Sequence, residues 1–100
     1  MLTKDQAIKL LHDSYPYLSA EYGVLKIGLF GSYAKGQPTE TSDVDVVVEF
    51  ARPIGLRFIE LSEYLETLFG KKVDLLTPTG IREIRVASVA RNIEESLLYV

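Results

Sequence analysis

Two short apolar segments, Val24 to Phe30 and Asp43 to Phe50, constrain the fold more than any other part of the sequence. Both are rich in β-branched and aromatic residues and are flanked by turn-forming residues, which is typical of buried strands. A third, shorter segment of the same kind runs from Lys72 to Leu76. Because helical patterns separate these strands, the sequence predicts an α/β (α+β) fold, with a small mixed β-sheet of about three strands flanked by helices.

The first helical pattern begins at Thr3, which forms a capping-box pattern with Gln6. Apolar residues then recur at helical spacing. Pro16 lacks the backbone N–H that a helix interior uses, so we expect a break near Tyr15. A short second helical piece would then run to about Tyr22.

Later segments continue the alternation of helices with strands. Residues 31–41 contain two glycines, a proline and several hydroxyl residues, which predicts a turn-like connection. Apolar stripes predict further helices over residues 58–68 and 86–97. Pro78 and Gly80 lie between the third strand and the last helix, and we expect them to break the chain there.

Length and charge limit the classes of function. With 100 residues, the chain is predicted to form a single domain over residues 1–100. Eleven basic residues against 14 acidic ones give a net charge of −3, which disfavours autonomous binding of nucleic acid. The sequence predicts no membrane span and no signal peptide, so we expect a cytoplasmic protein. Without cysteine and with one histidine, any metal must be held by carboxylates.

Three aspartates form the candidate metal site. Asp43 and Asp45 alternate along the second strand and therefore point to the same face, whereas the opposite face receives Val44, Val46 and Val48. Asp74 lies on the third strand and would join them if the two strands pair. A lone Asp-x-Asp is more often a polar strand edge facing water. Here all three carboxylates adjoin buried-type valine or leucine residues, which favours a site for a hard cation such as Mg²⁺.

A second candidate site lies in the turn that follows the first strand. Gly31 and Ser32 come directly after apolar residues and offer backbone N–H groups and a hydroxyl to an anion such as phosphate. Lys35 could add a positive charge, although a lone lysine in a polar loop is usually solvated. A plain strand-ending turn is the alternative for this segment, because no complete glycine-rich phosphate motif is present.

Taken together, these segments resemble a known signature. Gly31-Ser32, ten further residues and then Asp43-Val44-Asp45 is similar to the signature of the nucleotidyltransferase superfamily that includes DNA polymerase β. More narrowly, the run from Leu29 to Gly36 followed by Ser42 to Asp45 resembles the minimal nucleotidyltransferases of bacteria and archaea. The similarity spans most of the chain and includes the third aspartate.

The resemblance implies a role for each candidate residue. Gly31 and Ser32 would hold the β and γ phosphates of a nucleoside triphosphate, with ATP the expected substrate. Asp43 and Asp45 would ligate two Mg²⁺ ions, and Asp74 would complete one metal site and help to deprotonate the attacking hydroxyl. Many relatives have arginine where this chain has Lys35, an exchange that keeps the charge but loses bidentate phosphate geometry.

The resemblance also implies a partner. Many minimal nucleotidyltransferases are similar to antitoxins paired with a HEPN-type toxin, and some resemble enzymes that transfer AMP to a tyrosine of that partner. We therefore expect Mg²⁺-dependent adenylyl transfer to a partner protein, in a hetero-complex or homo-oligomer. The alternative is a catalytically inactive binding module that neutralises or regulates its partner by contact alone.

Overall fold

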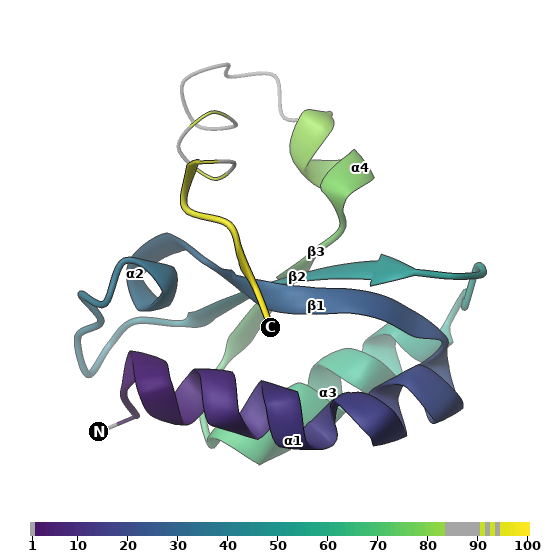
Figure 1. Cartoon of the computed structure of the whole chain (residues 1–100), viewed down its shortest axis with the longest axis horizontal. Coiled ribbons are helices and arrows are strands. Elements are labelled where there is room, and N and C mark those ends of the chain that lie inside the picture. The colour runs from purple at the N-terminus through teal and green to yellow at the C-terminus, as the bar shows by residue number, and fades with distance from the viewer. Residues whose placement is uncertain (1, 84–90, 92, 94) are drawn as a thin grey trace.

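A four-stranded sheet forms the centre of the computed structural model, which describes residues 2–83, 91, 93 and 95–100 (Figure 1). The strands lie in the order β3-β2-β1-β4. Their bounds are Val24–Phe30 for β1, Val44–Phe50 for β2, Val73–Leu76 for β3 and Leu98–Tyr99 for β4. β1 pairs antiparallel with β2 and with β4, whereas β2 and β3 are parallel. The predicted mixed sheet is confirmed, with β4 as an additional short edge strand.

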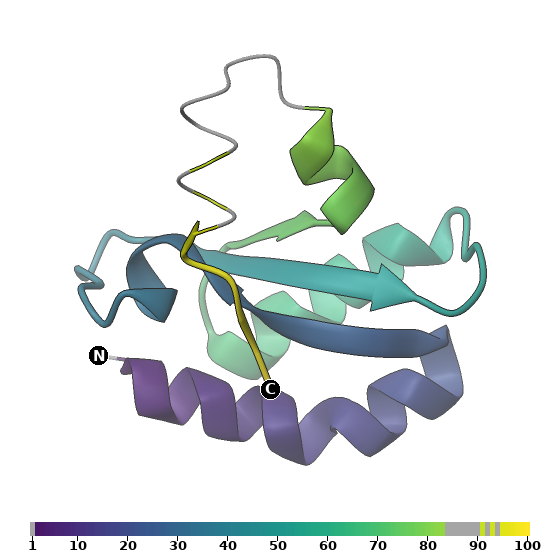
Figure 2. The ribbon, with the colours of Figure 1, turned by 45° about the horizontal axis from the view of Figure 1, so that its top comes forward.

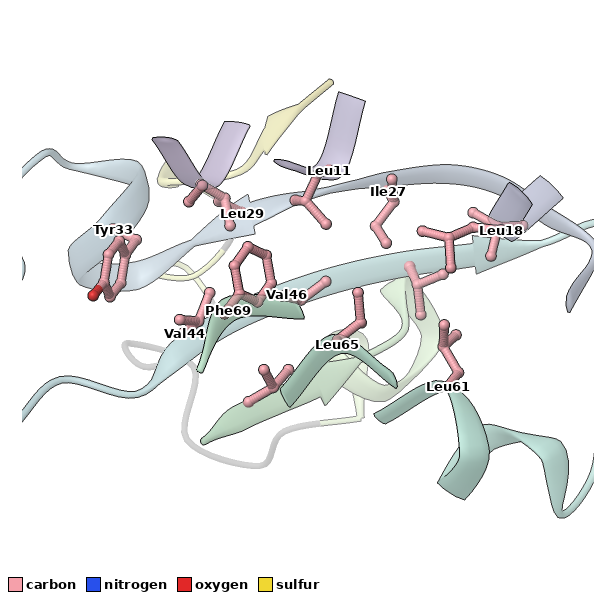
Figure 3. Close-up of a cluster of buried hydrophobic side chains, with 14 of the residues drawn as sticks. Leu11, Leu18, Ile27, Leu29, Tyr33, Val44, Val46, Leu61, Leu65 and Phe69 are labelled. Carbon is pink, nitrogen blue, oxygen red and sulfur yellow. The ribbon is translucent and has the colours of Figure 1, made fainter. Parts of the chain in front are cut away.

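Two long helices cover one face of this sheet. Figures 1 and 2 show α1 (Lys4–Tyr22) and α3 (Arg57–Phe69) side by side beneath the strands. Their buried leucines interdigitate with the side chains of β1 and β2 that point to the same face (Figure 3). The fully buried residues of this core include Leu11, Leu18, Ile27, Leu29, Val44, Val46, Val48, Leu61 and Leu65.

A smaller apolar cluster covers part of the opposite face. Phe30, Val47 and Ile81 are buried there, and Leu76, Ile93 and Leu97 pack against them. Ile81 belongs to the short helix α4 (Pro78–Arg82), which lies on the side of the sheet away from α1 and α3 (Figure 2). Val47 therefore contributes to one core while its neighbours Val46 and Val48 contribute to the other, as strand alternation requires.

The capping box at Thr3 is present, but the predicted break at Pro16 is wrong. Thr3 accepts from the Gln6 N–H, the Gln6 side chain accepts from the Thr3 N–H, and α1 continues through Pro16 to Tyr22. A proline removes only one backbone hydrogen bond of a helix. Burial of Leu18 and Tyr22 beyond the proline keeps the last turns in place, and Gly23 caps them.

The two connections predicted as turns or breaks contain short helices. α2 (Gly31–Ala34) follows β1 directly, and α4 begins at Pro78 after Thr77, whose hydroxyl accepts from the Gly80 N–H. Proline suits the first turn of a helix, so Pro78 starts α4 instead of breaking the chain. The helix predicted over residues 86–97 lies mostly outside the described residues.

In the described part of the chain, no helix combines the length and apolar character needed to cross a bilayer.

Tyr33 provides a test of the core. Its ring is fully buried in α2, and its hydroxyl finds no hydrogen-bond partner among the described residues. A buried, unpaired hydroxyl costs free energy, so we expect Tyr33→Phe to stabilise the fold by about 1 kcal/mol. Thermal melting would show this as a midpoint roughly 4 to 8 °C higher. Tyr17→Phe, on a half-exposed ring, is the control, and a lower midpoint for Tyr33→Phe would mean that the hydroxyl is satisfied.

Candidate active site

The parallel pairing of β2 with β3 places two of the predicted carboxylates side by side. Asp45 and Asp74 are direct partners in the register, and the pairing begins where the Val44 N–H donates to the Lys72 carbonyl at 2.9 Å. Neighbouring strands lie roughly 4.8 Å apart, so both side chains leave the sheet from adjacent points. The face that they share is the one opposite α1 and α3.

Gly31 lies against the Asp45 carboxylate. Phe30 pairs with Asp45 in the register of β1 and β2, so Gly31, the next residue, lies close to the Asp45 side chain. Gly31 has φ +68°, and a Cβ at this position would collide with Asp45 Oδ2. The position therefore requires glycine for two reasons, the left-handed backbone and the close approach of the carboxylate.

Asp43 lies just before β2 and is exposed. A compact turn leads into it, because the Thr39 N–H donates to Ser42 Oγ at 2.9 Å and the Ser42 N–H donates to the Thr39 carbonyl at 3.1 Å. The Lys71 ammonium fixes the same loop by donating to the Glu40 carbonyl at 2.9 Å. The loop thus delivers Asp43 to the end of β2 at which the pairing with β3 begins.

The carboxylates interact electrostatically. The pKa of Asp45 is raised from 3.8 to about 6, chiefly by partial burial, then by the charge of Asp74 and a hydrogen bond with it, and to a smaller extent by Asp43. A pKa raised by burial and by like charges marks a place where ionised carboxylates cost free energy. Clustered carboxylate oxygens are the donor set that a hard cation prefers.

The three carboxylates do not form a ready-made coordination shell. Among residues 2–83, 91, 93 and 95–100, no three acidic or histidine side chains are gathered in a geometry that would hold a metal ion. Asp45 and Asp74 are close to each other, whereas Asp43 affects Asp45 only through its charge. The structure therefore aligns Asp45 with Asp74 through the backbone and leaves Asp43 at the exposed strand end.

The turn at Gly31 and Ser32, called the phosphate turn after the ligand predicted for it, differs from the sequence prediction in one respect. Its Gly31 N–H, expected to be free, donates to Ser96 Oγ at 3.0 Å. Ser32 is half-buried at the start of α2, where helix amides have no intrahelical acceptor. Lys35 is exposed and forms no ion pair within the described residues. The contact of Ser96 was missed, since nothing in its local sequence indicates a neighbour 65 positions away.

A cavity of about 600 Å³ lies at the other end of β2, away from the carboxylates. Its lining includes Glu49, Arg52, Arg82 and Tyr99. The apolar cluster around Val47 and Ile81 lies on the same sheet face, between this cavity and Asp45. Because it contains none of the predicted site residues, the cavity does not identify the reacting centre.

Comparisons with known proteins agree in the kind of protein that they indicate. The profile of the family described as Nucleotidyltransferase domain matches residues 16–100. The protein adenylyltransferase MntA of Thermococcus cleftensis is 39% identical over 101 residues, which cover 100% of this chain and 98% of MntA. A Methanocaldococcus jannaschii protein, provisionally named a protein adenylyltransferase, is 42% identical over 103 residues and is covered completely.

Solved structures are similar in fold. A protein provisionally described as a minimal nucleotidyltransferase has a TM-score of 0.69 at 24% identity, with 97% of this chain and 95% of that chain covered. A toxin–antitoxin crystal structure with AMP-PNP has a TM-score of 0.61 at 26% identity, covering 98% of this chain and 72% of the other.

The raised pKa of Asp45 gives a pH prediction. Its folded-state value of about 6 exceeds 3.8, so this carboxyl contributes stability below pH 3.8 and the contribution is lost as pH rises to about 6. Because the group is partly exposed, we expect a loss of only about 1 kcal/mol. The free energy of unfolding, measured by denaturation without metal at pH 4 and pH 7, should show that Asp45→Asn removes this loss. Glu63→Gln, at an exposed position of α3, should keep it. Equal pH dependence in both variants would contradict the electrostatic interpretation.

Gly31 and Gly36 form a matched pair for testing the close approach. Both have left-handed backbones, φ +68° and φ +71°, but a Cβ at Gly36 would meet only Lys4 Cδ at 3.7 Å. We expect Gly36→Ala to cost roughly 1 kcal/mol of unfolding free energy from backbone strain alone. Gly31→Ala should cost about 2 kcal/mol or more, since the Asp45 carboxylate must also move. Urea denaturation measures both, and equal losses would argue against the contact.

Proposed function

The chain belongs to the nucleotidyltransferase domain family, in its minimal branch, and we propose that it transfers AMP from ATP to a tyrosine hydroxyl of a partner protein. One observation carries the proposal. The parallel register sets Asp45 beside Asp74, and the phosphate turn begins where Gly31 touches the Asp45 carboxylate. A phosphate group and two carboxylates can therefore meet at one strand end, as nucleotidyl transfer requires.

The donor set fits Mg²⁺. Asp43, Asp45 and Asp74 offer only oxygen atoms. The pKa of Asp45 is raised by partial burial and by neighbouring negative charge, and a divalent cation would offset that charge. We propose that Asp43 and Asp45 hold two Mg²⁺ ions and that Asp74 completes one of the two sites. Bound there, the ions would neutralise charge on the phosphate oxygens and on the departing pyrophosphate.

In the proposed step, the tyrosine oxygen attacks the α-phosphorus of ATP. A new oxygen–phosphorus bond forms as the bond to the bridging oxygen of pyrophosphate breaks, and pyrophosphate leaves. The hydroxyl proton passes to Asp74, whose carboxylate neighbours Asp45 in the sheet. A carboxylate can accept this proton as a general base when it lies within hydrogen-bond reach of the hydroxyl.

The phosphate turn binds the rest of the triphosphate in this proposal. The Ser32 hydroxyl and the amides that follow it hold the β and γ phosphates, while Gly31, whose N–H donates to Ser96, shapes the turn. Lys35, exposed one residue beyond α2, adds a positive charge near the same turn. Its single ammonium attracts phosphate without fixing the geometry as an arginine would.

The partner is proposed from the relatives. One similar protein carries the name protein adenylyltransferase MntA, and a similar crystal structure is described as the toxin–antitoxin MntA–HpeT. We propose that this chain is likewise an antitoxin, acting in the cytoplasm as one minimal domain of residues 1–100. Its partner would be a HEPN-type toxin, and modification of that toxin would neutralise it.

Regulation by contact alone is the second candidate function. One observation favours it: the three aspartates are not gathered into a coordination shell within the described residues. The two functions differ in what neutralises the partner. Full protection of cells by a variant with both Asp43→Asn and Asp45→Asn would favour contact over catalysis.

Asp45→Asn tests the catalytic proposal. The substitution preserves the shape of the side chain but removes the charge that would hold the cation, so we expect adenylyl transfer to fall at least about a hundredfold. Mass spectrometry of the partner, co-expressed with each variant, measures the added AMP. Glu63→Gln makes the same charge change on the outer face of α3 and should transfer normally. Undiminished transfer by Asp45→Asn would rule out this role.

A further inference from the structure

The C-terminal segment passes the phosphate turn at Ser96 and then pairs with the edge of β1. β4 pairs with Gly28 and Leu29, and the Val100 N–H donates to the Ile27 carbonyl at 2.9 Å. In Figures 1 and 2 the yellow C-terminal segment passes in front of β1, the strand with which it pairs. The approach is close, because a Cβ on Gly28 would lie only 2.7 Å from the Tyr99 Cα.

This pairing brings Ser96 to the turn between β1 and α2. Its hydroxyl accepts from the Gly31 N–H at 3.0 Å and donates to the Ile93 carbonyl at 3.0 Å. The hydroxyl proton is therefore committed to Ile93, so the oxygen meets Gly31 as an acceptor only. The two hydrogen bonds therefore fix the orientation of the Ser96 hydroxyl group.

Apolar packing anchors the residues on both sides of Ser96. Ile93 and Leu97 pack against the buried cluster of Phe30, Val47 and Ile81. Val47 is on the same face of β2 as Asp45, two residues further along the strand. Ser96 is itself half-buried, so it is fixed to the sheet face that carries the candidate site.

We propose that Ser96 is a positioning residue for the nucleotide, which fixes the phosphate turn from the C-terminal segment. This role rests on the proposed function. Gly31 is confined on two sides, because its N–H donates to Ser96 and the Asp45 carboxylate fills the space that a Cβ would occupy. Because the Gly31 peptide is fixed, the Ser32 hydroxyl and the amides that follow it keep one position relative to Asp45. They are therefore pre-organised for phosphate, which lowers the entropy cost of binding.

Ser96→Ala tests the role by its effect on MgATP. Loss of one hydrogen bond from the turn should raise both the Kd and the KM for ATP about three- to tenfold, while kcat stays within about twofold. Ser96→Thr retains the hydroxyl and should recover wild-type binding. Ser62→Ala on α3 is the control, because Ser62 is also half-buried and its side chain has no hydrogen bond to the described residues.

Two further measurements keep the outcomes separate. Hydrogen exchange of the Gly31 amide should accelerate in Ser96→Ala and not in Ser62→Ala, which checks that the contact has been removed. If Ser96→Ala does not fold, Ser96→Cys keeps the shape with a weaker acceptor and should show the same rise in Kd.

The outcome for MgATP then decides between the proposals. Wild-type protein that binds MgATP, together with a Ser96→Ala variant that binds it equally well or more tightly, would overturn the role of Ser96 alone. Wild-type protein that does not bind MgATP, alone or with its partner, would overturn the proposed function and this role with it.

Discussion

The parallel pairing of β2 with β3 is the interaction on which the candidate site depends. It places Asp45 directly beside Asp74, two residues that are 29 positions apart in the sequence. Parallel strands need a crossover connection, and α3 supplies it by packing Leu61 and Leu65 into the main core. The burial of α3 therefore stabilises the register of β2 and β3. That register brings the two aspartates together on the opposite face of the sheet.

Bringing these carboxylates together costs stability. Burial and the charge of Asp74 raise the pKa of Asp45, so near neutral pH the ionised form carries unfavourable repulsion. The fold tolerates this cost because the buried valines that alternate with Asp45 are well packed beneath it. Repelling carboxylates add nothing to the stability of the fold, and this supports the binding role proposed for them.

Backbone contacts between distant segments shape the phosphate turn. Gly31 fits between the Asp45 carboxylate and the Ser96 hydroxyl only because it has no side chain. The same holds for Gly28, where the C-terminal strand approaches the backbone of β1 too closely for a Cβ. Glycine thus allows both β2, which carries Asp45, and the C-terminal segment to reach one turn.

The sequence by itself determined the local elements and the chemistry. Alternation in Val44 to Phe50 assigned the faces of β2 correctly, and the boundaries of the three predicted strands agree with the structure to within one residue. The spacing from Gly31-Ser32 to the aspartates indicated the family that the comparisons then identified. These features are set by residues that are close together in the sequence, so a local pattern reports them directly.

Only the tertiary structure decided the strand order, the pairing of Asp45 with Asp74 and the contact of Ser96 with Gly31. It also decided that α1 continues through Pro16, because packing of Leu18 and Tyr22 outweighs the lost backbone bond. Each of these outcomes is a balance of burial and hydrogen bonding between segments far apart in the chain, and no local pattern reports such a balance.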